Sequence, residues 1–181
     1  MILKVEKQFN VLEAQRKALF EEVGKLSHEQ HNFKPTPKSW SMLQVFMHLI
    51  TAESNSLKYM NKKILGISDI PKSGIAASLR SVALNKGLKA PIKYKAPAAA
   101  LPEFKEIYFF DTLVQEWAIL REDLKKLLDQ LDAANADKLI YKHPIGGRLN
   151  IYQALSFYHE HIAHHQEQIE RVKSHANFPT K

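Results

Sequence analysis

Hydrophobic residues recur at steps of three and four along most of this chain, and this spacing is typical of an α-helix with one apolar face. Four long segments carry the pattern, and they predict helices over 3–26, 42–64, 103–131 and 150–173. No segment alternates apolar and polar residues in the way that indicates a β-strand. The pattern therefore predicts an all-α fold, a four-helix bundle whose apolar faces meet in one core.

The connections between these helices differ greatly in length. Residues 28–38 contain two prolines, after which Ser39 or Ser41 can cap the second helix. Residues 66–102 are broken by proline and glycine, and only a short helix over 75–85 is expected there. Because a short loop would make the second and third helices antiparallel, this long crossover predicts that they run parallel.

Three charged residues fall on the predicted inner faces. Arg16 lies within the apolar stripe of the first helix. Asp111 and Arg121 interrupt the inner face of the third helix, which begins with Phe104 and Ile107. Such a group is either part of a structural ion pair or aimed at a functional site. The structural explanation is the commoner one, and we expect it for all three.

Length and composition indicate one soluble domain over 1–181. No apolar stretch approaches the roughly 18 residues that span a bilayer, and the charged N-terminal residues do not fit a signal peptide, so a cytoplasmic location is expected. The absence of cysteine excludes disulfides, thiolate ligands and a cysteine nucleophile.

The net charge is +7, but the basic residues are scattered, which favours a solvated surface over a nucleic-acid partner. The densest basic groups are Lys58, Lys62 and Lys63, then Lys86, Lys89, Lys93 and Lys95.

Histidines supply the candidate chemistry. Residues four apart on a helix share a face, so His161 and His165 point together towards the apolar stripe of the last helix. His164 falls outside that stripe, and His159 lies nearly opposite it and is expected in solvent. Burying an imidazole without a partner costs about 1–3 kcal/mol. The inward pair is therefore satisfied either by other core groups or by a shared divalent ion.

His48 favours the divalent ion. It stands beside the apolar stripe of the second helix, and bundles assemble metal sites from inward side chains on facing helices. Three protein ligands leave a coordination position open, which marks a catalytic rather than a closed structural site. The peptidase signature His-Glu-x-x-His is absent, because Ala163 stands where the second histidine would follow His159.

Three segments together resemble the DinB-like superfamily of metal-binding four-helix proteins. The first, Lys-Ser-Trp-Ser-Met-Leu-Gln-Val-Phe-Met-His-Leu at 38–49, is similar to the family's Trp-Ser segment before a helix-two histidine. The second, His-Pro-Ile-Gly-Gly-Arg-Leu-Asn at 143–150, is similar to its turn before the last helix, and it predicts a tight turn here. The third, His-Ile-Ala-His-His-Gln-Glu-Gln-Ile at 161–169, is similar to its paired histidines.

The resemblance implies parallel second and third helices and a divalent ion held by His48, His161 and His165. Zinc is the first choice, although nickel, iron and manganese also accept imidazole. Family members are often dimers, and those with assigned activities include transferases that use low-molecular-weight thiols such as bacillithiol, mycothiol or glutathione.

The open site and the resemblance together predict a metal-dependent enzyme, a thiol S-transferase or a hydrolase, acting on a small molecule. The sequence identifies no catalytic residue beyond the ligands. The alternative is a non-catalytic stress-response module that binds a metal or small ligand, with a fourth protein group closing the coordination shell.

Overall fold

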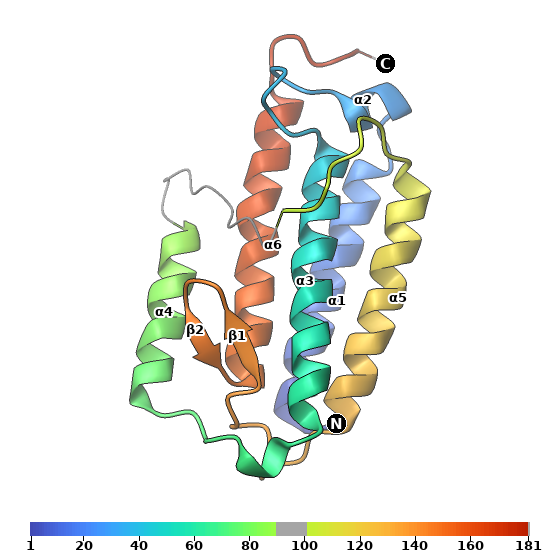
Figure 1. Ribbon diagram of the computed structural model, residues 1–181. Coiled ribbons are helices and arrows are strands. Elements are labelled where there is room, and N and C mark those ends of the chain that lie inside the picture. Colours follow the sequence, from blue (N-terminus) through green and yellow to red (C-terminus); the bar gives the residue numbers. More distant parts are fainter. Residues whose placement is uncertain (90–100, 181) are drawn as a thin grey trace.

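The computed structural model describes residues 1–89 and 101–180. Its bundle consists of four long helices, α1 (Leu3–Val23), α3 (Met42–Ile64), α5 (Phe110–Asp129) and α6 (Ile151–Lys173). Helices α1 and α6 run in one direction and α3 and α5 in the other (Figure 1). The all-α bundle with parallel α3 and α5 is therefore confirmed.

The crossover between α3 and α5 contains a helix that packs on the bundle. After the 3-10 turn η1 (Ile67–Asp69), helix α4 (Ile75–Lys89) runs back along α6 and buries Ala77 and Ser81. It is longer than the expected helix over 75–85. The basic residues Lys93 and Lys95 lie outside the described residues.

Two capping boxes fix where the histidine-bearing helices begin. Ser41, rather than Ser39, accepts a hydrogen bond from the backbone N–H of Gln44, and the Gln44 side chain accepts one from the Ser41 N–H in return. Asn150 and Gln153 do the same at the start of α6. Because a cap of this kind is worth about 1 kcal/mol, these residues set the register of each helix and hence the direction of its histidines.

The third long helix was predicted to begin too early. It starts at Phe110, not near residue 103. The Asn32 side chain, at the end of the short helix α2 (His28–Asn32), accepts a hydrogen bond from the Tyr108 N–H and donates one to the Tyr108 carbonyl. These backbone groups are thereby held away from a helix. Phe104 and Ile107 consequently do not lie on a helical inner face.

The absence of strands was also a wrong prediction. Strands β1 (Tyr141–His143) and β2 (Gly147–Leu149) form an antiparallel hairpin where a simple turn was expected. The hairpin lies between α4 and the bundle (Figure 1). Gly147 has φ +69°, a left-handed conformation that glycine adopts without strain.

The predicted structural role holds for two of the three charged residues. Arg121 makes a buried ion pair at 2.7 Å with Glu53, and Arg16 pairs at 2.7 Å with Glu13 on its own helix. Asp111 is exposed instead and does not interrupt the inner face of α5. It has no ion-pair partner among residues 1–89 and 101–180.

Candidate metal centre

Three histidines from two helices converge inside the bundle, as the sequence predicted. His48 comes from α3, and His161 and His165 come from successive turns of α6. One ring nitrogen from each lies within 4.8 Å of the others. Their exposed fractions are 2%, 9% and 8%, so the cluster is inside the protein rather than on its surface.

The spacing of the ring nitrogens fits a shared ion. The Nε2 atoms of His48 and His161 are 3.3 Å apart, and those of His165 and His161 are 3.1 Å apart. Two ligand atoms at about 2.0–2.1 Å from one tetrahedral ion are separated by about 3.3 Å. The His161 Nε2 therefore stands from each of the other two at about the separation that coordination requires, and all three histidines offer a ligand atom within 4.8 Å of the others.

Burial and the neighbouring rings keep His161 and His165 neutral. Burial lowers the pKa of His161 well below its usual value, and the neighbouring His165 and His48 lower it further. Burial, again with His48, lowers the pKa of His165 to about 3. A neutral imidazole keeps a lone pair on one nitrogen, and that lone pair is what a metal ion binds.

Gln168 selects which nitrogen of His165 carries its proton. The Gln168 Oε1 lies 2.8 Å from the His165 Nδ1, and because a carboxamide oxygen accepts, Nδ1 is the donor. The lone pair is therefore on Nε2, the atom that faces the cluster. Orienting contacts of this kind are a regular feature of metal-ligating histidines.

Comparison with known proteins agrees with this geometry. Residues 11–169 match the profile of the DinB superfamily. The chain belongs to the DinB superfamily. The uncharacterized protein YuaE of Bacillus subtilis (strain 168) is 24% identical over 148 residues, which cover 82% of this chain and 86% of the relative. No solved structure gives a significant match. Superfamily membership and the three-histidine cluster together fit a protein that binds a divalent metal ion.

Aromatic side chains enclose the cluster of this DinB superfamily member. Trp40 lies against His48 with ring centroids 5.2 Å apart, and stacks on His165 at 6.4 Å. Phe104 packs against Trp40 with ring centroids 5.0 Å apart, and Phe157 stacks on His161 at 5.1 Å. These rings limit access of water, and electrostatic interactions are stronger in such surroundings.

Further histidines stand near the cluster without joining it. His143, on β1, packs edge-on against Phe157 with ring centroids 4.4 Å apart. Its Nδ1 accepts the backbone N–H groups of Ile145 and Gly146. The Nδ1 of His164 lies 2.7 Å from the carbonyl of Leu88 on α4. His164 lies outside the three-histidine cluster as expected, and the side chain of His159 is 43% exposed.

Sequence reasoning missed the residues that surround the histidines. The sequence indicated Trp40 only as part of the Trp-Ser segment at 38–49 that resembles the family, and not as a neighbour of the histidines. Gln168 follows His165 by three positions, a spacing at which helical side chains meet, so this orienting contact had a readable signal. The stacking of Phe157 on His161 joins residues four apart on α6 and was readable in the same way. The approach of His143 depends on how the hairpin docks, and the sequence offers no signal for that. None of the described helices combines the length and apolar character that crossing a bilayer requires.

Proposed function

We propose that this chain is a metal-dependent enzyme that holds one divalent ion through the Nε2 atoms of His48, His161 and His165. The distances of the His161 Nε2 from the other two, 3.3 and 3.1 Å, carry the proposal, since they are close to the spacing of ligands around a tetrahedral ion. Within 1–89 and 101–180 no fourth histidine or carboxylate joins the group. Three protein ligands leave a position for substrate, which favours an enzyme over a closed structural site.

Zinc is the ion that we propose, because it accepts nitrogen ligands in a tetrahedral arrangement and does not change its oxidation state. A bound divalent ion would supply Lewis acidity, lowering the pKa of a water or thiol held beside the imidazoles. The protein residues would do the rest: Gln168 fixes the His165 ring, and Trp40 and Phe157 exclude water around the reacting groups.

The reaction class that the site supports best is transfer to a low-molecular-weight thiol. Hydrolysis commonly needs a carboxylate base beside the activated water, and no described carboxylate lies in the ligand group. A thiol needs less help, because its free pKa of about 8.5 is already close to neutral. Hydrolysis of esters or amides is the second candidate, favoured by the open position and by the nearby imidazole of His143.

A paired activity assay tests this proposal. Zinc-loaded wild-type protein would be assayed with bacillithiol, mycothiol and glutathione against a panel of electrophiles, and separately with ester and amide substrates. We expect thiol consumption that His161→Ala abolishes and His159→Ala retains. Activity on esters or amides alone would make the protein a hydrolase. Inactivity on both panels, with one ion still bound per chain, would instead support the non-catalytic binding module.

A further inference from the structure

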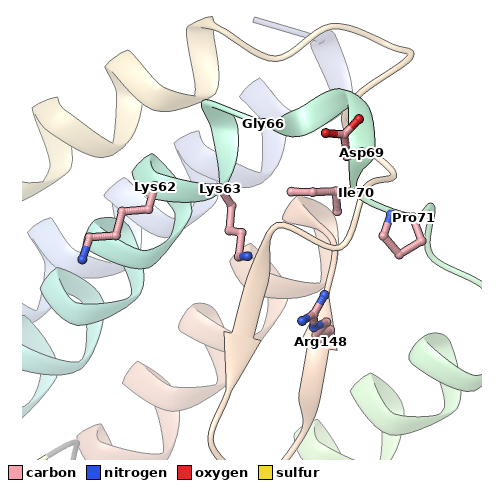
Figure 2. A pocket seen from close by; sticks show the side chains of 7 residues that line it. All are labelled: Lys62, Lys63, Gly66, Asp69, Ile70, Pro71 and Arg148. Carbon is pink, nitrogen blue, oxygen red and sulfur yellow. The ribbon is translucent and has the colours of Figure 1, made fainter.

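A hollow lies far from the histidines, at the opposite end of α3. It has a volume of about 250 Å³, and Figure 2 shows the side chains around it. Its charged lining residues are Lys62, Lys63, Asp69 and Arg148. Lys63 follows His48 by about four helical turns, roughly 22 Å along the axis. Whatever this hollow binds does not contact the histidine cluster directly.

The charges around this hollow are not balanced. Neither Lys63 nor Arg148 has an ion-pair partner in the part of the chain that the structure describes. Figure 2 shows both side chains extending to the same side of η1, whereas the Asp69 carboxylate points away from them. The Asp69 Oδ1 accepts a hydrogen bond from Ser68 at 3.2 Å. Two cations from separate elements therefore share a concave surface without a neutralising anion.

The register of the hairpin adds a third cation. Lys142 on β1 pairs directly with Arg148 on β2. Side chains at directly opposite positions project from the same face, and like charges placed this way destabilise a hairpin. A local conflict of this kind is expected where a residue serves binding rather than stability.

The rim of the hollow is held in place by hydrogen bonds from a distant segment. Lys138 donates from Nζ to the carbonyls of Ile67 and Ser68, at 2.7 and 2.8 Å. The N–H of Leu139 donates to the Pro71 carbonyl at 3.0 Å. The loop after α3 is thus fixed in shape, and a fixed loop lowers the ordering cost of binding a ligand.

A purely structural explanation covers only part of this arrangement. Lysines in the last turn of a helix are favoured by its dipole, which accounts for Lys62 and Lys63 at the end of α3. The dipole does not account for Arg148, which belongs to the hairpin, or for Lys142 opposite it.

We propose that this hollow binds a phosphate group through Lys63 and Arg148, with Lys142 contributing at its edge. A guanidinium donates two parallel hydrogen bonds to a phosphate, and an ammonium adds a compact charge beside it. A soluble phosphate ester and a lipid headgroup present the same chemistry. The hollow is a binding site additional to the histidine cluster, and it does not depend on the proposed enzymatic activity.

Titration with inorganic phosphate tests this site. Chelator-treated protein, with no ion at the histidines, would be titrated by calorimetry while sodium chloride holds the ionic strength constant. Lys63→Glu/Arg148→Glu would be compared with Lys7→Glu/Lys17→Glu, which makes the same charge change on exposed positions of α1. We expect saturable binding of one phosphate, weakened at least about tenfold in the first variant and less than about twofold in the second.

Three results would overturn the site. These are the absence of saturable binding to the wild-type protein, equal weakening in both variants, and no weakening in either. Circular dichroism melting checks that both double variants fold. If Lys63→Glu/Arg148→Glu does not fold, Lys63→Gln/Arg148→Gln replaces it. Sedimentation with phosphatidylcholine vesicles containing phosphatidic acid then distinguishes a lipid headgroup from a soluble phosphate ester as the ligand. Co-sedimentation that Lys63→Glu/Arg148→Glu abolishes assigns a lipid headgroup, and its absence assigns a soluble phosphate.

Discussion

Two polar clusters are buried in this bundle, and α3 contributes to both. One contains His48, His161 and His165. The other joins Glu53, five positions after His48, to Arg121 on α5 at 2.7 Å. In the same charged cluster Arg16 pairs with Glu13, whose Oε1 lies 3.6 Å from the Arg121 Nε. The Trp117 N–H also donates to Glu53.

The two clusters differ in what they need from outside the chain. The charged cluster has two guanidinium groups and two carboxylates, so its formal charges cancel within the protein. The histidine cluster brings one ring nitrogen from each of three imidazoles within 4.8 Å of the others, and burial lowers the pKa of His161 and His165 so that these two are neutral. Charges of opposite sign satisfy each other, whereas converging lone pairs require a cation or a donor. Burial of polar groups is common to both, and only the second arrangement indicates a ligand.

The largest expected effect comes from breaking the charged cluster. Burial raises the pKa of Glu53, although Arg121 opposes this shift. Arg121→Met would leave that carboxyl buried without its cation and is expected to cost about 3–5 kcal/mol of unfolding free energy at pH 7. Because a raised pKa favours the protonated folded state, the variant should regain stability as the pH falls.

Urea unfolding of chelator-treated protein measures this effect. The double variant Glu53→Gln/Arg121→Met removes both charges and is expected to recover most of the loss. Equal destabilisation in the single and double variants would show that the ion pair is not what makes the substitution costly. Metal content should be unchanged in both variants, because the charged cluster does not contribute to metal binding at the histidine cluster.

Removal of the metal ion is the next largest effect. An ion that binds only the folded protein, present at 100 times its dissociation constant, stabilises it by about 2.7 kcal/mol. Chelation should therefore lower the unfolding free energy of the wild-type protein and of Glu53→Gln/Arg121→Met by the same amount. His161→Ala should show no response to chelation. A response that persists in His161→Ala would place the ion elsewhere.

The pH dependence of stability should include a contribution from His143. Burial lowers its pKa from 6.5 to about 4, so the folded state binds this proton less readily than the unfolded state. The stability that the neutral ring provides is present above about pH 6.5 and is lost as the pH falls towards 4. His143→Asn keeps an acceptor for the turn but does not titrate.

Unfolding measured from pH 7 to pH 4 separates this contribution from that of the other histidines. The wild-type protein is expected to lose roughly 2 kcal/mol more than His143→Asn over this range. Parallel curves for the two proteins would mean that His143 keeps an ordinary pKa in the folded state.

The smallest expected effect concerns the orientation of one ligand. Gln168→Leu removes the acceptor for the His165 Nδ1 proton but leaves all three histidines in place. Loss of such an orienting contact typically weakens metal binding about tenfold. Competition with a chromophoric chelator measures the change. Gln166→Leu, on the same helix, serves as the control, and equal affinities for both variants would remove Gln168 from the site.

The helical periodicity of the sequence predicted most of the fold and the convergence of the three histidines. The spacing of His161 and His165 depends only on helix geometry, and His48 only on the inner face of α3, so all three were readable. The hairpin was not, because each strand has three residues, too few for an alternating pattern to show. The late start of α5 follows from the bond between Asn32 and Tyr108, which are distant in sequence.

The central claim is that His48, His161 and His165 share one divalent ion, and metal content tests it most directly. Protein purified without a nickel column would be analysed by plasma mass spectrometry, beside the three single alanine variants and His159→Ala as a control. We predict one divalent ion per chain in the wild-type protein and in His159→Ala, and almost none in the other three. Metal-free wild-type protein that also fails to take up added zinc, or alanine variants that retain the ion, would contradict the account.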